Sequence, residues 1–183
     1  MATVAIGEDG LARCSWAAGP EYVAYHDQEW GRPVRGDDPL FEKISLEAFQ
    51  SGLSWITILR KRPAFRKAFK GFSIAKVAAF SGKDVDRLMA DAGIVRNLAK
   101  IEATIANARV ALDLDQPLTE LLWSFAPPKR ARRTEIPATT TESVAMAKAL
   151  KKRGFRFVGP TTAYALMQAT GMVDDHIKGC YIK

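Results

Sequence analysis

The sequence predicts an all-α protein, and three observations support this class. Apolar residues recur at helical spacing in one segment after another, Pro, Gly and Asp separate these segments, and no stretch alternates apolar and polar residues for long enough to predict a sheet. The 183 residues, 48% of them hydrophobic and 26% charged, have the composition of an ordinary globular protein. The length fits one domain or two closely joined lobes.

The predicted helices carry apolar residues on one face, and a final helix begins at Pro160. In chain order, the others cover residues 40–51, 63–69, 74–80, 84–93, 97–115, 119–126 and 143–153. Ser73 is a candidate N-cap for the third, and Gly93 is a candidate C-cap for the fourth. A basic stretch at 129–133, which either faces a partner or is solvated, and a Pro/Thr-rich stretch at 136–141 interrupt the helical pattern.

Composition excludes several classes of protein and favours an acidic partner. No apolar run approaches the roughly 18–20 residues of a membrane span. The N-terminal stretch MATVAIGEDGLAR lacks the apolar run of a secretory signal, so we expect a cytoplasmic protein. The 27 Lys and Arg residues against 20 Asp and Glu residues give a net charge of +7, which favours nucleic acid as a partner.

The chain contains two cysteines and two histidines, and together they could bind a metal ion. The four residues are Cys14, His26, His176 and Cys180. If the last segment is helical, His176 and Cys180 lie on one face, about 5–6 Å apart at their β-carbons. Two imidazoles and two thiolates make a closed tetrahedral zinc site, which would tie the two ends of the chain together. The alternative is two core cysteines and two unrelated histidines.

The segment 149–171 predicts a hairpin between two helices. Gly154 can end the first helix in a left-handed conformation, and Pro160 fits the first turn of the second. Backbone N–H groups near Gly159 would then favour an anion. The basic residues around this turn are Lys151, Lys152, Arg153 and Arg156. The pattern is typical of a helix-hairpin-helix clamp for DNA phosphates, and the alternative is a helical corner with a solvated basic face.

Glu47 lies on the apolar face of the predicted 40–51 helix. At 100° per residue it falls in the stripe that contains Leu40 and Ile44. A buried carboxylate is costly without a partner, so this position indicates either a structural pair or a functional pocket. Aromatic residues gather in the same third of the chain, at Trp16, Tyr22, Tyr25, Trp30 and Trp55. They form either ordinary core or, with the carboxylate, a pocket for a flipped cationic nucleobase.

Six segments carry a resemblance to a known family. They are RCSW (13–16), YVAYHDQEWG (22–31), LFEKISLEAFQSGLSWITIL (40–59), DAGIVRN (91–97), ALKKRGFRFVGPTT (149–162) and DDHIKGC (174–180). With them the chain closely resembles the DNA-3-methyladenine glycosylase type I family, a bacterial branch of the helix-hairpin-helix DNA glycosylases. Residues 1–12 fall outside the resemblance, and we expect them to be a poorly ordered extension of one domain at 13–183.

The resemblance implies a fold, a reaction and a set of site residues. The fold has two helical lobes, a helix-hairpin-helix at about 143–171, and a structural zinc that joins the N- and C-terminal segments. The reaction is hydrolysis of the N-glycosidic bond of 3-methyladenine in alkylated double-stranded DNA by base flipping, carried out by a monomer with one Zn²⁺ per chain. The zinc ligands fall on Cys14, His26, His176 and Cys180, the base-recognising glutamate on Glu47, and the pocket aromatics on Trp16, Tyr22, Tyr25 and Trp55.

Two further positions qualify the expected chemistry. Bifunctional relatives use a lysine two residues beyond the second hairpin glycine, and this position is Thr161 here, so we expect no lyase activity. Asp174 stands where many relatives have an aspartate and the type I enzymes commonly have Asn. We interpret it as an incidental polar residue rather than as a stabiliser of the oxocarbenium ion.

The turn at 51–54 is a candidate for the element that fills the gap left by a flipped base. Gly52 could bring the backbone close to DNA, and Leu53 could enter the base stack. The alternative is a helix C-cap followed by a core leucine. For the whole protein, the alternative to an enzyme is a non-catalytic, zinc-stabilised DNA-binding module, and only the enzyme would release free base.

Overall fold

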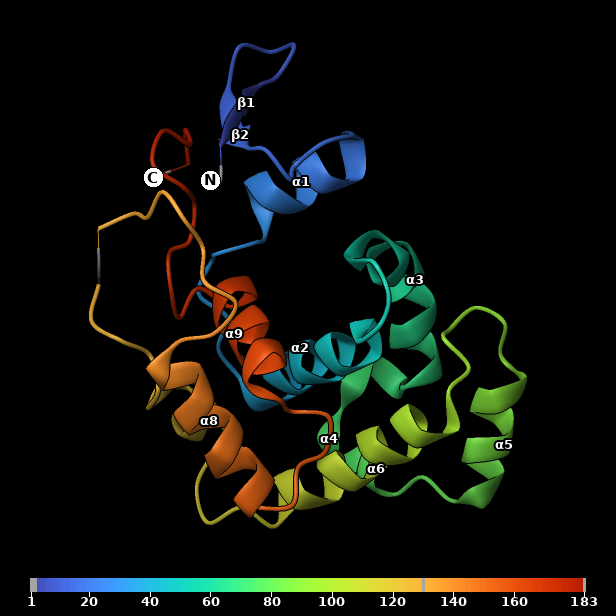
Figure 1. Ribbon diagram of the computed structural model, residues 1–183. Coiled ribbons are helices and arrows are strands. Elements are labelled where there is room, and N and C mark those ends of the chain that lie inside the picture. Colours follow the sequence, from blue (N-terminus) through green and yellow to red (C-terminus); the bar gives the residue numbers. More distant parts are fainter. Residues whose placement is uncertain (1–2, 130, 183) are drawn as a thin grey trace.

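The structure is a computed structural model that describes residues 3–129 and 131–182, and most of the chain is helical (Figure 1). The strands are β1 (Val4–Ile6) and β2 (Ala12–Cys14). The α-helices are α1 (Pro20–Gln28), α2 (Asp37–Gln50), α3 (Trp55–Ala68), α4 (Ile74–Ala78), α5 (Gly82–Ala90), α6 (Leu98–Leu112), α7 (Leu118–Trp123), α8 (Thr141–Lys152) and α9 (Pro160–Ala169), and a 3₁₀ turn covers Lys70–Phe72. In the described part of the chain, no helix is long and apolar enough to cross a membrane.

The N-terminal residues form a small antiparallel sheet, which the sequence analysis did not expect. In β1 and β2, Val4 pairs with Cys14 and Ile6 pairs with Ala12. The prediction of a poorly ordered extension is therefore wrong for residues 3–12. Strands of three residues are too short to show an alternating pattern, and the backbone N–H of Tyr181 donates to the Ala12 carbonyl (2.7 Å), a long-range bond that sequence periodicity cannot indicate.

The helices match the predicted order, with some different boundaries and one addition. The α3 helix runs through Pro63, where the sequence analysis expected a helix to begin, because Ile58 and Phe65 are buried on either side of the proline. The α5 helix ends before Gly93, so this glycine is not its C-cap. The α1 helix was not predicted, since its nine residues have no clear apolar face.

The α2 helix lies at the centre of the fold. It contacts α3, α6, α7 and α9, and nearly every residue from Leu40 to Phe49 is buried. The ring of Phe49, which belongs to α2, packs against those of Phe65 and Phe69, with 4.7 and 5.8 Å between ring centroids. This dense packing fixes the position of any side chain that α2 presents to a cavity.

The two ends of the chain lie close together (Figure 1). Cys14, Ile177 and Cys180 form a small core of their own, separate from the main one. A cluster of three buried residues contributes little hydrophobic stabilisation compared with a full domain core. Other interactions are therefore needed to hold the ends of the chain together.

Candidate functional site

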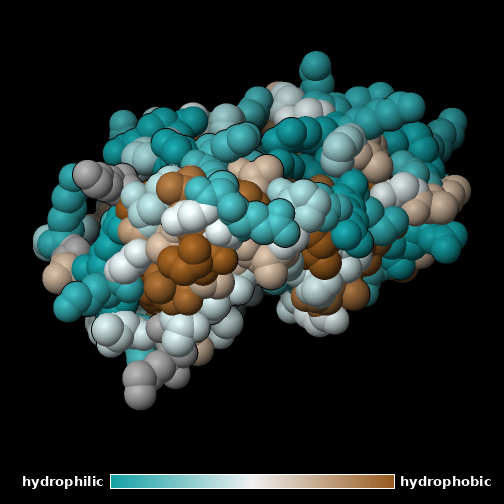
Figure 2. Space-filling model, turned by 90° about the horizontal axis from the view of Figure 1, so that it is seen from above, coloured by the Kyte–Doolittle hydropathy of each residue, from teal (hydrophilic) through white to brown (hydrophobic). Residues whose placement is uncertain are grey.

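A cavity of about 530 Å³ lies between α1 on one side and α2, α3 and α9 on the other. Its walls include all four predicted pocket aromatics and Glu47: Trp16, Tyr22, Tyr25, Glu47 and Trp55. Figure 2 shows the molecule from the side of α1, where apolar residues gather in small patches on a mostly hydrophilic face. The cavity is large enough and apolar enough to hold a small aromatic ligand.

Glu47 enters this cavity from α2, and its side chain is buried at 5% exposure. Among the described residues no hydrogen-bond donor reaches its carboxylate. Burial raises its pKa to about 7, and the positive charge of Lys43 opposes this shift only in part. A buried carboxylate without a partner, at the wall of an aromatic cavity, indicates a ligand that carries positive charge or N–H donors.

The raised pKa of Glu47 predicts a stability that depends on pH. Glu47 binds its proton more tightly in the folded state than in the unfolded state. Protonated Glu47 therefore stabilises the folded state fully below about pH 4.5, and this stabilisation is lost as pH rises through about 7. Glu47→Gln removes the ionisation. We expect the free energy of unfolding of this variant, relative to the original protein, to increase by about 3 kcal/mol between pH 4 and pH 8. Urea unfolding at several pH values measures it, and a constant difference would contradict the buried, ionisable carboxylate.

The aromatic side chains support one another around Glu47. The ring of Trp16 makes T-shaped contacts with the rings of Tyr22 and Trp30, with 5.8 Å and 5.0 Å between ring centroids. The Tyr22 hydroxyl accepts a hydrogen bond from the backbone N–H of Ile56 (3.0 Å), near the beginning of α3. The indole N–H of Trp55 is buried and has no hydrogen-bond partner among the described residues. The cavity thus offers flat faces and a free donor to a ligand.

The cavity wall also includes polar residues to which the sequence analysis gave no role, among them Gln168 and Asp175. Asp175 is buried and accepts hydrogen bonds from the Tyr164 hydroxyl (2.5 Å) and the Gln168 amide (2.9 Å). The sequence shows two adjacent aspartates, Asp174 and Asp175, but only the tertiary structure shows that Asp175 is the one that lines the cavity.

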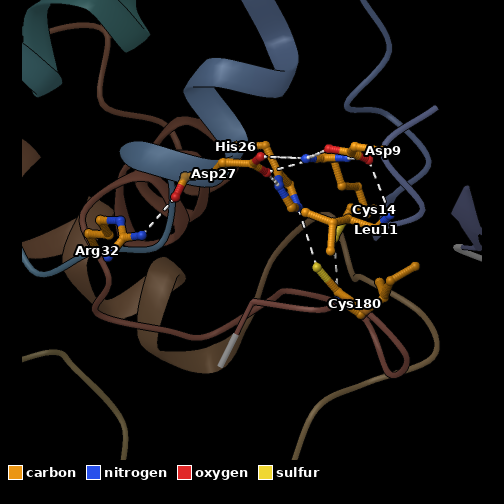
Figure 3. A network of polar contacts seen from close by, with 9 residues as sticks. Asp9, Leu11, Cys14, His26, Asp27, Arg32 and Cys180 are labelled. Carbon is orange, nitrogen blue, oxygen red and sulfur yellow. Dashed lines mark hydrogen bonds and ion pairs between the residues drawn. The ribbon is translucent and has the colours of Figure 1, made fainter. Parts of the chain in front are cut away.

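Three of the four predicted metal ligands come together where the chain ends meet, and the fourth, His176, packs against one of them. The ligand atoms of Cys14, His26 and Cys180 lie within 4.8 Å of one another (Figure 3). The ring of His176 lies beside that of His26, with 4.9 Å between centroids. The Nε2 atom of His176 is buried and has no hydrogen-bond partner among the described residues. Burial raises the pKa of the Cys14 thiol to about 11, so a thiolate here requires a cation.

Each histidine of this cluster is oriented by an aspartate. His26 Nδ1 lies 2.8 Å from a carboxylate oxygen of Asp27, and His176 Nδ1 lies 3.1 Å from one of Asp174. Both imidazoles therefore keep Nε2 available for a metal ion, as is common in histidine metal sites. The contacts continue from Asp27 to the guanidinium of Arg13, which also donates a hydrogen bond to Asp9.

The structure corrects two expectations about this region. Residues 176–180 are not helical; a turn with Gly179 at φ 99° precedes Cys180, whose Sγ lies 3.5 Å from His26 Nε2. Asp174 is not incidental, because it fixes His176 and accepts a hydrogen bond from Arg132 (3.0 Å). The same arginine reaches the Cys180 carbonyl (3.3 Å), so part of the basic stretch holds the C-terminal segment, while residue 130 lies outside the described residues.

The predicted hairpin is present between α8 and α9. Gly154 adopts φ 98° after α8, and α9 begins at Pro160 after Gly159. Phe155 and Val158 are buried between the helices. The four basic residues of this turn are all exposed: Lys151, Lys152, Arg153 and Arg156. The turn presents positive charge and a helix N-terminus on one surface.

The turn at 51–54 is exposed next to the cavity. Gly52 adopts φ 83°, and the Leu53 side chain is 42% exposed. Leu53 is therefore not a core residue, which was the alternative to a role in DNA contact. Its backbone N–H donates to the Gln50 carbonyl (2.6 Å), so the turn closes directly on the end of α2.

Comparisons with known proteins agree with this geometry. Residues 16–183 match the family model described as methyladenine glycosylase. The chain is 49% identical to DNA-3-methyladenine glycosylase 1 of Escherichia coli (strain K12) over 179 residues, which cover 93% of this chain and 96% of that protein. A crystal structure of 3-methyladenine DNA glycosylase I superposes with a TM-score of 0.89 at 46% identity, covering 92% of this chain and 98% of that one. A structure of the Staphylococcus aureus enzyme, described as the structural basis of 3-methyladenine recognition, has a TM-score of 0.85 at 35% identity, covering 89% and 91%.

Proposed function

This chain belongs to the methyladenine glycosylase family, and from that membership we propose how its pocket removes 3-methyladenine from alkylated double-stranded DNA. The protein is a DNA repair glycosylase that hydrolyses the N-glycosidic bond. The observation that carries the assignment of its pocket is the buried carboxylate of Glu47, which has no hydrogen-bond partner among the described residues, in an aromatic cavity.

The chemistry of the substrate fits this pocket. Methylation at N3 gives the adenine base a positive charge, which neutral adenine lacks. A flipped, cationic base would stack on the aromatic rings of the pocket and place its charge and N–H groups near the Glu47 carboxylate. Because a charge interaction is strong in a site that excludes water, Glu47 favours the methylated base over the unmodified one.

The reaction needs little help from an acid. The bond between C1′ of the sugar and N9 of the base breaks, its electron pair goes to the base, and the base leaves as neutral 3-methyladenine. Water adds to C1′ and gives up a proton to solvent, which leaves an abasic site. The enzyme is monofunctional, and Thr161 at the start of α9 provides no amine for a Schiff base with the sugar.

The cluster of Cys14, His26, His176 and Cys180 would hold one structural Zn²⁺ ion. Three of its ligand atoms lie within 4.8 Å of one another, and the ring of His176, whose Nε2 has no hydrogen-bond partner among the described residues, lies 4.9 Å from that of His26. Two thiolates and two imidazoles fill a tetrahedral site and leave no position for water, so the ion would have a structural role. It would join the N-terminal segment to the C-terminal one and so hold α1 over the cavity.

The exposed basic hairpin would bind the DNA backbone next to the pocket. A monomer suffices for this arrangement, because one chain supplies the cavity, the hairpin and the 51–54 turn. Backbone N–H groups at Gly159 and the charges of Lys152 and Arg156 would contact phosphates without reading sequence.

Removal of two hairpin charges should weaken DNA binding. We expect Lys152→Ala with Arg156→Ala to lower duplex affinity about tenfold for any sequence, and to reduce the slope of log K against log salt by about 2, because each lost phosphate contact contributes about 0.9. Fluorescence anisotropy at several salt concentrations measures both quantities. Lys76→Ala with Lys83→Ala removes the same charge from the exposed surfaces of α4 and α5 and serves as the control. Equal affinities for the two double variants would place the DNA contact elsewhere.

A further inference from the structure

A buried lysine holds the turn that follows the Glu47 helix. Lys100 belongs to α6 and is only 7% exposed. Its ammonium group donates hydrogen bonds to the Phe49 carbonyl (2.9 Å) and to the Ser51 carbonyl (2.6 Å). These oxygens lie at the C-terminal end of α2, where backbone carbonyls lack partners within the helix and carry partial negative charge.

Lys100 has no carboxylate partner within the part of the chain that the structure describes. Burial lowers its pKa, so keeping a lysine at this position has a cost. The benefit is geometric: the two hydrogen bonds fix both the last turn of α2 and the residue before Gly52. Held in this way, the turn closes with Gly52 at φ 83° and leaves the Leu53 side chain exposed beside the cavity.

The same helix also holds the basic hairpin. Asn107, two turns after Lys100 on the same buried face of α6, accepts a hydrogen bond from the backbone N–H of Arg156 (2.8 Å) and donates one to its carbonyl (3.0 Å). One rigid helix therefore fixes the 51–54 turn through Lys100 and the 154–159 turn through Asn107. Its length sets the distance between these two exposed turns.

We propose that Lys100 is a positioning residue for base extrusion. It keeps the 51–54 turn in the shape that allows Leu53 to occupy the gap left by the flipped base. The α6 helix holds this turn at a fixed distance from the hairpin that contacts the DNA backbone. This inference rests on the proposed function. A turn that is already ordered does not lose conformational freedom when it enters the DNA, so extrusion of a paired base becomes easier.

The test compares two substrates that differ in the difficulty of extrusion. In one duplex 3-methyladenine faces thymine, and in the other it faces an abasic site, where no base pair must be broken. Lys100→Met keeps an unbranched side chain that is one atom shorter, and it removes the donors and the charge. We expect single-turnover base release from the paired substrate to fall at least tenfold, and release from the unpaired substrate to fall less than threefold.

Thr104→Val is the matched control. Thr104 lies one turn after Lys100 on the same buried face, and its hydroxyl donates only to the Lys100 carbonyl (2.9 Å), within the helix. We expect this variant to behave like the original protein on both substrates. If Lys100→Met does not fold, Lys100→Gln, which keeps an amide donor, is compared by the same ratio of the two rates. An equal loss on both substrates, or no loss, would overturn the inference.

A second readout separates this inference from the proposed function. 2-Aminopurine placed next to a non-hydrolysable analogue of 3-methyladenosine becomes brighter when the stack opens, and this signal requires no bond cleavage. We expect the brightening to be reduced in Lys100→Met and retained in Thr104→Val. If the original protein releases no base from either substrate, the proposed function fails, and the fluorescence still decides whether Lys100 controls extrusion.

Discussion

Glu47→Gln should reduce the release of 3-methyladenine from methylated duplex DNA by about 100-fold or more, with the fold retained. Glutamine keeps the size of the side chain and one acceptor oxygen but has no charge to attract a cationic base. The buried position of Glu47 makes this charge effective, because little water screens it. Chromatography of the free base after single-turnover incubation measures the loss.

Two comparisons make this result specific to the pocket. Glu102→Gln makes the same chemical change at an exposed position on α6 and should leave release unchanged. For the original protein, kcat/KM should rise with pH through about 7, as Glu47 loses its proton, and the residual activity of Glu47→Gln should lack this rise. Unchanged release in Glu47→Gln would make the carboxylate structural. No release from the folded original protein would favour a DNA-binding module.

Loss of the metal site should produce the largest effect on stability. We expect metal analysis to find about one zinc per chain in the original protein and none in Cys14→Ser with Cys180→Ser. A cross-link that closes a loop of more than 100 residues contributes about 4–5 kcal/mol in the chain-entropy model. For a protein of this size, that corresponds to a fall in melting temperature of roughly 10–20 °C. Differential scanning calorimetry before and after treatment with a chelator measures this fall in melting temperature.

A graded variant tests the arrangement around the metal site. Asp27→Asn weakens the hold on His26 Nδ1 without removing a ligand, so we expect zinc affinity to fall by about 10–100-fold while saturated protein still holds one ion. Competition with a chelating dye measures the affinity. Unchanged zinc stoichiometry in the double cysteine variant would contradict the site, and unchanged affinity in Asp27→Asn would contradict the role of the aspartate.

Local patterns predicted a large part of the fold and of the candidate site. Helical spacing placed Glu47 on the apolar face of its helix, and the structure buries it there. Gly154 and Pro160 predicted the hairpin because each residue restricts the backbone within one turn, and both occupy the expected positions. The same local reasoning was wrong at Pro63, where packing of Ile58 and Phe65 keeps α3 continuous through a residue that usually begins or ends a helix.

The sequence by itself identified the candidate residues for the chemistry, whereas the tertiary structure decided how they meet. Cys14 and Cys180 were candidates from the sequence, but a turn at Gly179 rather than a helix brings the second cysteine to the cluster. The contact of Lys100 with the Ser51 carbonyl had no signal in the sequence. The physical reason is range: periodicity and caps depend on neighbours a few residues away, while these contacts join distant segments and exist only when the core is packed.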